Sequence, residues 1–244
     1  MLPLTKGRYT ARIADTPQGM HRALSLRHLC FIANRGLVTA TDADAFDDAS
    51  LHVLVDDTRS GTTVCCFRLM PFTSGGTILT SYSAQFYDLS RLSTYPGPMA
   101  ELGRFCIHPE HPDPDILRLA WGALTRIVDA TAVQMLFGCT SFEGADPALH
   151  QNALAQLTEA HLAPNIWKPG IKSLHAYPFA PLKHPSPKSI TTMPPLLRTY
   201  LAMGGWVSDH AVIDHALNTL HVFTALEIAA IPAARARLLR SLAT

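Results

Sequence analysis

The chain has 244 residues, 48% of them apolar and 16% charged, with 20 Lys and Arg side chains against 19 Asp and Glu. This composition supports a substantial core and excludes a disordered chain. The near balance of charge leaves no basic field for nucleic acid, so we expect no nucleic-acid partner.

The five cysteines stand in apolar segments without paired spacing, which argues against a disulfide framework and favours reduced thiols. The opening residues MLPLTKGRYT lack the apolar centre of a signal peptide. No run approaches the roughly 18 uninterrupted apolar residues of a spanning helix. We therefore expect a cytoplasmic protein that is neither secreted nor transmembrane.

The first part of the chain predicts a helix and then a β-hairpin. Apolar residues recur at helical spacing over residues 19–33, with Arg27 at the edge of the apolar face. After the acidic loop DADAFDD, two apolar runs flank the turn DDTRSGT, and Arg68 lies near the end of the second run. Residues 74–98 combine glycine, serine and aromatic residues and predict a third strand before a short helix.

The middle of the chain alternates strand and helix, which is typical of an α/β protein. The pattern predicts a strand over Met99–His108, a helix from Asp113 to residue 133, a strand over 133–142 and a helix that begins at Asp146 with proline in its first position. Residues 163–195 are basic and punctuated by proline, as in a long ordered loop or a lid. Beyond them we expect a helix over 196–205, a strand over 219–228 and a basic helix over 232–242.

Glu101 and Arg104 stand three residues apart inside the predicted strand Met99–His108. A buried charge is costly unless it is paired or used, so two interpretations compete: a structural ion pair and a catalytic site. The residues by themselves leave the two at even odds.

Several motifs in order resemble the acyl-carrier-protein-dependent N-acyltransferases of the GNAT fold. They are Arg27 with Phe31, DAFD from Asp44 to Asp47, Arg68-Leu69, Glu101 with Arg104-Phe105, and GCTSFEG with Ser141. Acyl-homoserine-lactone synthases share this pattern. The segments ELGRFCIHPEHPDPDILRLAWG and MPPLLRTYLAMGGWV resemble the ornithine-lipid N-acyltransferases more closely, and this resemblance covers nearly the whole chain.

The resemblance implies an α/β (mixed α+β) fold: a GNAT-like domain with a central twisted mixed sheet, flanking helices and a C-terminal extension. We expect one domain over residues 1–244, with its core at about 8–162 and the proline-rich loop and C-terminal elaboration at 163–244. The implied reaction moves a 3-hydroxy fatty acyl group from acyl carrier protein to the α-amine of L-ornithine, giving lyso-ornithine lipid. The acyl-phosphopantetheine of the carrier protein would be the donor, and no permanently bound cofactor or metal is expected.

Two alternatives remain open at this stage. Glutamine is the alternative acceptor, since related aminolipid synthases use it. A non-catalytic module that binds acyl carrier protein or lipid is the alternative function.

The same resemblance distributes roles among the residues. Glu101 is the candidate base, against the alternative of a structural ion pair with Arg104 or Arg68. Arg104 and Arg27 would hold the ornithine carboxylate. Asp44 and Asp47 would bind the side-chain ammonium of ornithine or brace Arg27 and Arg68, and Asp48 is not excluded from this role. Ser141 would contact the thioester oxygen or the 3-hydroxyl, and Phe31 and Arg68 would belong to the substrate site. The acyl and phosphopantetheine chain would contact Phe105, Cys106 and Ile107.

Two further expectations concern the donor and the membrane. The loop HPEHPDPD replaces the glycine-rich pyrophosphate loop of acetyl-CoA-dependent relatives, which disfavours coenzyme A and favours a carrier protein. Basic residues of the terminal helix, Arg235, Arg237 and Arg240, suggest peripheral contact with the inner membrane as an alternative to a packed helix. The lysines of the proline-rich loop would serve the membrane or the carrier protein: Lys168, Lys172, Lys183 and Lys188.

Overall fold

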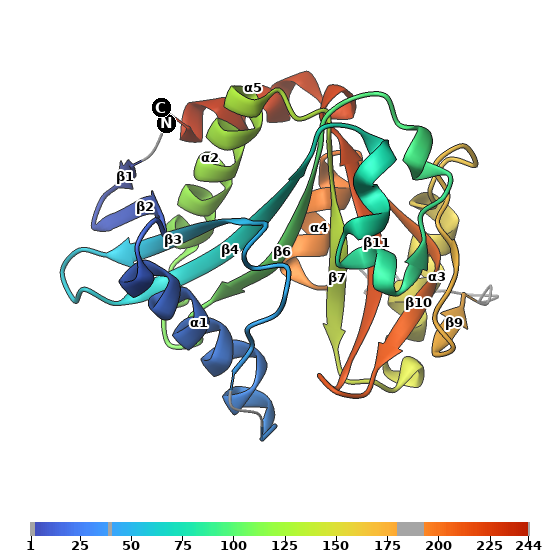
Figure 1. The fold of residues 1–244 in the computed structure, drawn as a ribbon, viewed down its shortest axis with the longest axis horizontal. Helices are drawn as coiled ribbons and strands as arrows, with labels where there is room; N and C mark the ends of the chain where they lie inside the picture. Colours follow the sequence, from blue (N-terminus) through green and yellow to red (C-terminus); the bar gives the residue numbers. More distant parts are fainter. Residues whose placement is uncertain (1–2, 39–40, 180–192, 244) are drawn as a thin grey trace. The chain divides into compact units, whose positions relative to one another are not determined.

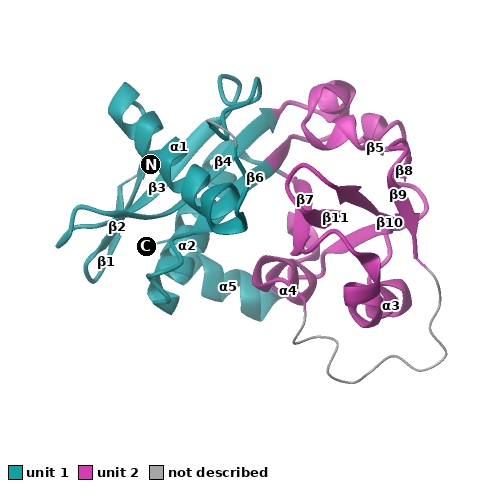
Figure 2. Cartoon of the chain, turned by 90° about the horizontal axis from the view of Figure 1, so that it is seen from below, with its two compact units in different colours: residues 1–71, 102–133, 233–244 teal, residues 72–101, 134–232 magenta. Residues whose placement is uncertain are grey.

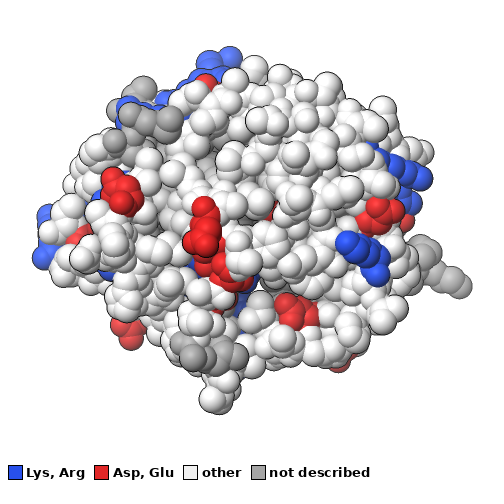
Figure 3. Space-filling view, in the orientation of Figure 1, with Lys and Arg blue, Asp and Glu red and all other residues white. Residues whose placement is uncertain are grey.

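The computed structural model describes residues 3–38, 41–179 and 193–243 of a mixed α/β chain (Figure 1). The chain divides into two compact units (Figure 2). Unit 1 comprises Met1–Pro71, Leu102–Val133 and Ala233–Thr244, and unit 2 comprises Phe72–Glu101 and Gln134–Pro232. In the face shown in Figure 3, acidic and basic side chains are scattered in small groups over a largely uncharged surface.

Unit 1 is an antiparallel sheet with helices on both faces. Its strands follow the order β1-β2-β3-β4-β6. Their bounds are β1 Leu4–Lys6, β2 Tyr9–Ile13, β3 Leu51–Asp57, β4 Thr63–Phe72 and β6 Met99–Ile107, of which the part from Leu102 belongs to this unit. The helices are α1 Pro17–Phe31, η1 Ala33–Arg35, α2 Pro114–Thr131 and α5 Ala233–Leu242.

The two faces of this sheet are assigned by the side-chain alternation of its strands. Cys66 packs against α1 in an apolar cluster, and its neighbour Phe67 stacks on Phe105, which in turn contacts Trp121 of α2. Glycine at position 122 permits α5 to approach α2, because a Cβ there would collide with the carbonyl oxygen of Leu242. Helices α1 and α2 therefore cover opposite faces.

Unit 2 contains the later strands of the same strand order, beginning with the first residues of β6, Met99–Glu101. These pair in parallel with Met135–Phe137 of β7, and β11 then pairs antiparallel with β7 along its whole length. The order is β6-β7-β11-β10-β9, with β7 Met135–Glu143, β11 Thr219–Glu227, β10 Trp206–Asp214 and β9 Ala176–Pro178. A separate two-stranded sheet joins β5 Tyr87–Asp88 to β8 Gly170–Ile171.

The helices of unit 2 close one side of this sheet. Helix α3, Gln151–Ala160, and helix α4, Pro195–Ala202, pack against β7, β10 and β11 through a cluster of buried apolar side chains. Leu154, Leu197 and Val222 are among them. The short 3-10 turns are η2 Gly75–Thr80, η3 Ser83–Gln85, η4 Leu92–Thr94, η5 Pro147–His150 and η7 Ile228–Ala230.

The fold class predicted from the sequence is confirmed: the sheets are mixed because β6 and β7 run parallel while the other pairs are antiparallel. The helix 19–33, the hairpin, the strand 99–108 and the helix 113–133 all form. Asp113 caps α2 by accepting a hydrogen bond from the backbone N–H of Asp115. Both units hold residues of the expected core 8–162, and a single domain over 1–244 stays a prediction.

Two local predictions were wrong, and one predicted helix begins as a 3-10 turn. Residues 74–98 hold the short turns η2, η3 and η4 and the two-residue β5 in place of a strand and a helix. The helix predicted from Asp146 forms with Asp146 as its cap and proline in its first position; its first turn is the 3-10 turn η5, and α3 continues from Gln151. Strands β1, β2 and β10 were missed because short or serine- and histidine-containing segments show little alternation. Within the predicted loop 163–195, residues 180–192 lie outside the described residues.

Candidate functional site

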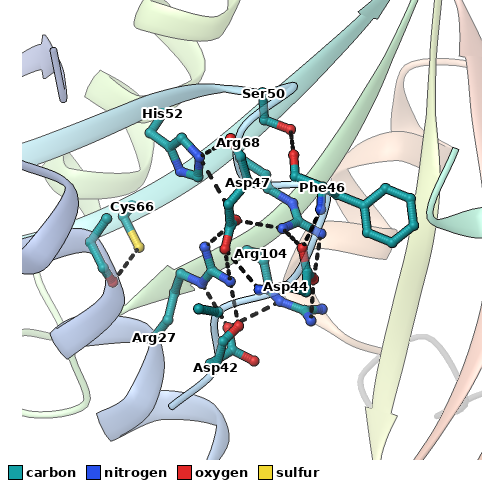
Figure 4. A network of polar contacts seen from close by, with 12 residues as sticks. Arg27, Asp42, Asp44, Phe46, Asp47, Ser50, His52, Cys66, Arg68 and Arg104 are labelled. Carbon is teal, nitrogen blue, oxygen red and sulfur yellow. Dashed lines mark hydrogen bonds and ion pairs between the residues drawn. The ribbon is translucent and has the colours of Figure 1, made fainter.

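Three arginines and three aspartates of unit 1 form one network of ion pairs (Figure 4). The arginines come from three different elements, α1, β4 and β6, and the aspartates all come from the acidic loop before β3. The members are Arg27, Arg68, Arg104, Asp42, Asp44 and Asp47. With equal numbers of each sign, the network is electrically balanced.

Arg27 is the most buried member, at 1% exposure. Its Nε donates to Asp42 Oδ2 at 2.6 Å and its Nη1 donates to Asp47 Oδ1 at 2.6 Å. Its Nη2 donates to the backbone oxygen of Asp42 and to Asp47 Oδ2. Because these contacts engage all three nitrogens of the guanidinium, Arg27 fixes the acidic loop to α1.

Asp47 is held by Arg27 and by Arg68, whose Nη1 donates to Asp47 Oδ1 at 2.6 Å. Burial alone would raise the pKa of Asp47, but hydrogen bonds from Arg27, from the backbone N–H of Asp44 and from Arg68, together with the charge of Arg27, lower that pKa to about 2. His52 lies beside this carboxylate, with Nε2 at 3.0 Å from the backbone oxygen of Asp47. Burial lowers the pKa of His52. Asp47 is therefore an anion at the centre of the network.

Asp44 and Arg104 are the most exposed members, at 21% and 15%. Arg104 Nη2 donates to Asp44 Oδ2 at 2.9 Å, and Arg68 holds both oxygens of the same carboxylate. Arg104 Nε also pairs with Asp42 Oδ2 at 3.0 Å. Asp44 and Arg104 thus form the part of the network that a dissolved molecule can reach.

The acidic loop is shaped by its own side chains. The backbone N–H of Phe46 donates to Asp44 Oδ1, and the backbone N–H of Asp44 donates to Asp47 Oδ2. Such local contacts favour tight turns over helix or strand. The Phe46 ring lies 5.8 Å from the Arg68 guanidinium, a cation–π contact.

Arg104 has a left-handed backbone, with φ of 53°. A non-glycine residue in this region costs roughly 1–3 kcal/mol, and such strain gathers at functional sites. It stands in the middle of β6, three residues after Glu101. The strained backbone of Arg104 therefore lies in the same short segment of β6 as Glu101, the other charged residue that the sequence analysis singled out.

Glu101 belongs to unit 2 and is 4% exposed. Its carboxylate accepts three hydrogen bonds: Tyr82 N–H to Oε2 at 2.9 Å, Ser83 N–H to Oε1 at 2.7 Å, and Ser83 Oγ to Oε1 at 2.5 Å. Three donors on one carboxylate favour its ionised form. Sequence reasoning missed these partners because they lie in residues 74–98.

Ser141, the second predicted catalytic residue, is exposed on β7 and faces His221 of β11 in the strand register. Phe137 is the β7 residue paired with Glu101, so Ser141 lies four residues further, about 13 Å along the strand. Cys139 lies closer, with its sulfur 3.4 Å from Ser83 Oγ. The role of Ser141 stays a prediction.

The predicted acyl-contacting residues do not share one face of β6. Phe105 stacks on Phe67 at 5.5 Å, whereas Cys106 packs under α1 with its sulfur 3.4 Å from that of Cys66. Ile107 contributes its backbone oxygen to Cys30. The acyl contact of all three residues stays a prediction.

Two other residues considered for the substrate site, Phe31 and Asp48, differ in placement. Phe31 ends α1 and its ring lies 5.5 Å from the Arg35 guanidinium. Asp48, which the sequence left open, is exposed and takes no part in the ion network. Asp42 is the member that sequence reasoning missed; its signal was its place at the start of the same acidic run. The contacts of the ion network show that the carboxylates of the acidic loop brace Arg27 and Arg68.

The five cysteines are free thiols; Cys65, Cys66 and Cys106 are buried, and Cys30 and Cys139 are partly exposed. Among the described residues, no group of three His, Cys, Asp or Glu side chains has a metal-binding arrangement. In the loop HPEHPDPD, Asp113 accepts hydrogen bonds from Tyr9 and from the first turn of α2.

Several lysine and arginine side chains of the C-terminal third form ion pairs or hydrogen bonds. Lys168 pairs with Asp209 at 2.5 Å, and Lys172 donates to the backbone oxygen of Ala84. In α5, Arg240 pairs with Asp129 of α2, while Arg235 and Arg237 are exposed. Lys183 and Lys188 lie outside the described residues. Over the described part of the chain, no helix is long and apolar enough to cross a bilayer. Membrane contact by α5 stays a prediction.

Comparison of the chain with known proteins identifies its family. The Acetyltransferase (GNAT) domain model matches residues 26–122. An L-ornithine N(alpha)-acyltransferase of Rhodobacter capsulatus is 30% identical over 90% of each chain. One of Brucella abortus is 32% identical over 91% of this chain and 85% of its own. This chain belongs to the L-ornithine N(alpha)-acyltransferase family.

Solved structures show the same fold as this family member. FeeM, an N-acyl amino acid synthase from uncultured soil microbes, has a TM-score of 0.55 at 11% identity and covers 92% of this chain and 94% of its own. The acyl-homoserine lactone synthase BjaI, solved with SAM and isopentyl-CoA, has a TM-score of 0.50 at 13% identity and covers 95% of this chain and 86% of its own. The predicted family and its acyltransferase class are confirmed for this L-ornithine N(alpha)-acyltransferase family member.

Proposed function

We propose that the protein transfers a 3-hydroxy fatty acyl group from the thioester of an acyl carrier protein to the α-amine of L-ornithine, giving lyso-ornithine lipid. The observation that carries the acceptor is the Asp44–Arg104 ion pair, whose two side chains are partly exposed while the other members of the network are buried. The names of the two relatives point to the same amino acid.

Ornithine offers a carboxylate and a side-chain ammonium besides the reacting amine. Arg104 provides a planar guanidinium that suits a carboxylate, and Asp44 provides an anion that suits the ammonium. The ligand would replace one ion pair by two and so keep the charges balanced. Arg27 and Asp47, with their polar atoms engaged by each other, would hold this pair in place.

Glu101 would receive the proton that the attacking amine must lose. It is three residues from Arg104 on β6, so their Cα atoms are at most about 11 Å apart. In the transfer, the amine nitrogen attacks the thioester carbon, the C–N bond forms, and the C–S bond breaks. The α-ammonium first loses one proton to solvent; the second proton, released as the amide forms, passes to Glu101 and from Glu101 to the leaving carrier thiolate, so that the products are the amide and the free carrier thiol.

The donor is the acyl-phosphopantetheine of a carrier protein. The support is chemical: the loop between β6 and α2 contains Glu110 and uses Asp113 for capping, and Asp115 stands in the first turn of α2. A coenzyme A diphosphate would meet these negative charges, whereas a carrier arm has one phosphodiester.

The test uses purified protein with a 3-hydroxyacyl carrier thioester and ornithine. Free carrier thiol should appear only when ornithine is present, together with the N-acylated product by mass spectrometry. Glutamine is the comparison acceptor; because its side chain has no ammonium for Asp44, its reaction should be slower. Preference for glutamine would overturn the acceptor, and no thiol release with either would leave a non-catalytic binding module.

A further inference from the structure

Residues 81–85 of unit 2 form a cradle around the Glu101 carboxylate. The cradle is the turn Ser81–Gln85, which includes η3, and it is held by Ser81, whose Oγ accepts a hydrogen bond from the backbone N–H of Ala84 at 3.2 Å. Ser83 is fully buried, and Glu101 is 4% exposed. The contact therefore takes place away from water, where a hydrogen bond to a charged group is strong.

Ser83 gives Glu101 two hydrogen bonds. Its backbone N–H and its hydroxyl both donate to Oε1, at 2.7 and 2.5 Å. Tyr82 N–H donates to the other oxygen, Oε2. Donors on both oxygens fix the plane of the carboxylate, and the two on Oε1 distinguish that oxygen from Oε2.

The Ser83 hydroxyl is itself oriented by a neighbour. It has one proton, which the short contact assigns to Glu101, so the 3.4 Å contact with Cys139 is a hydrogen bond donated by the thiol to Ser83 Oγ. The chain of donors runs from Cys139 of β7 through Ser83 to Glu101. Each link points the next proton toward the carboxylate.

We infer that Ser83 is a positioning residue that fixes the orientation of Glu101 and stabilises its anion for acyl transfer, an inference that rests on the proposed function of Glu101 as the base. A carboxylate aimed by its partners spends less of its time in unproductive orientations, and errors of about 1 Å in such groups cost up to roughly 100-fold in rate. Ser83 does not touch the reacting atoms.

The test compares Ser83→Ala with Ser81→Ala in the intact protein. Ser83→Ala removes one donor from Glu101, whereas Ser81→Ala removes a buried hydroxyl of the same turn that accepts a hydrogen bond from the backbone N–H of Ala84. We expect Ser83→Ala to lower kcat by about 10- to 100-fold with little change in the KM for ornithine, as for loss of a hydrogen bond to a charge. Ser81→Ala loosens the turn but leaves the Ser83 donors in place, so it should lower kcat less than Ser83→Ala does.

The pH profile separates positioning from a general loss of structure. With fewer donors on the anion, Glu101 takes up a proton more readily, so the acidic limb of kcat should move to higher pH in Ser83→Ala. Ser83→Thr keeps the hydroxyl and should restore the wild-type position of that limb. Thermal unfolding of each variant gives the control for folding.

The outcomes distinguish the inference from the function beneath it. Equal kcat losses in Ser83→Ala and Ser81→Ala with an unmoved acidic limb, or wild-type kinetics in Ser83→Ala while Glu101→Gln is inactive, would overturn the role of Ser83 and leave Glu101 as the base. Full activity in Glu101→Gln would overturn the base itself. In the double variant Ser83→Ala/Glu101→Gln, we expect no loss beyond that of Glu101→Gln alone.

Discussion

Arg104 donates a hydrogen bond to Asp44 at 2.9 Å across 60 residues of sequence, and the same carboxylate accepts two hydrogen bonds from Arg68. Asp44 is thus the point at which the acidic loop meets both β4 and β6. Since this pair is also the most exposed part of the network, a substitution there tests ligand binding more than stability.

Asp44→Asn removes the anion proposed to receive the ornithine ammonium. We expect the KM for ornithine to rise at least tenfold, in line with loss of about 1.4 kcal/mol or more from one charge-assisted contact. The reaction with glutamine should be less affected, since glutamine has no ammonium there. Steady-state kinetics with both acceptors measure this, and Asp48→Asn, an exposed carboxylate of the same loop, is the control. A parallel change for both acceptors would contradict the assignment.

Arg104→Lys replaces a planar fork by a single ammonium. The lysine keeps the charge but cannot reproduce paired contacts to carboxylates, so we expect a raised KM for ornithine or loss of activity. Kinetics over a range of ornithine concentration check the result. Unchanged constants would assign Arg104 a purely structural role.

Glu101→Gln should abolish most acyl transfer, because the amide cannot accept the amine proton. The amide is not neutral for the fold either. Its NH2 would face a backbone or hydroxyl donor of Tyr82 or Ser83, which costs about 1–3 kcal/mol for an unsatisfied buried group. Thiol release and chemical denaturation measure the two effects. Wild-type turnover across pH would remove Glu101 as the base.

Asp47→Asn should destabilise the fold, because it leaves Arg27 and Arg68 buried with one anion fewer. Removing one partner from a buried ion pair costs about 3–5 kcal/mol. Asp48→Asn changes the same chemistry at an exposed position outside the network and should stay within about 0.5 kcal/mol of wild type. Urea unfolding of the two variants makes the comparison. Equal stability of both would show that the network contributes nothing at Asp47.

We expect the folded protein to lose stability in mild acid because His221 is buried. Burial lowers the pKa of His221 to about 4, against 6.5 in an unfolded chain. Its contribution is therefore complete above pH 6.5 and is lost as pH falls from 6.5 to 4, by about 3 kcal/mol in total. His221→Gln should flatten this part of the profile of unfolding free energy against pH, whereas His215→Gln, at an exposed position, should not. A profile unchanged by His221→Gln would show that other groups cause the slope.

The sequence predicted those elements whose local pattern is strong. Helix α2 carries an amphipathic stripe and a capping aspartate, and the hairpin of β3 and β4 carries two apolar runs around a turn. Residues 74–98 were predicted wrongly because their conformation is set by distant partners: Ser83 is placed by Glu101, and a Cβ at Gly75 would collide with the backbone of Leu92. Neither contact can be inferred from the conformational preferences of the residues in this segment.

By itself, the sequence determined the acyltransferase family and the mixed α/β class, and it singled out Arg27, Asp44, Asp47, Arg68, Glu101 and Arg104 as candidates. Only the tertiary structure decided which of these charged side chains pair with one another in the interior and which a ligand can reach. Arg27 and Asp47 satisfy each other in the interior, Asp44 and Arg104 remain within reach of a ligand, and Glu101 binds the Ser83 turn. The physical reason is that the cost of a buried charge is set by its partners and its exposure, and both depend on residues brought together from distant parts of the chain.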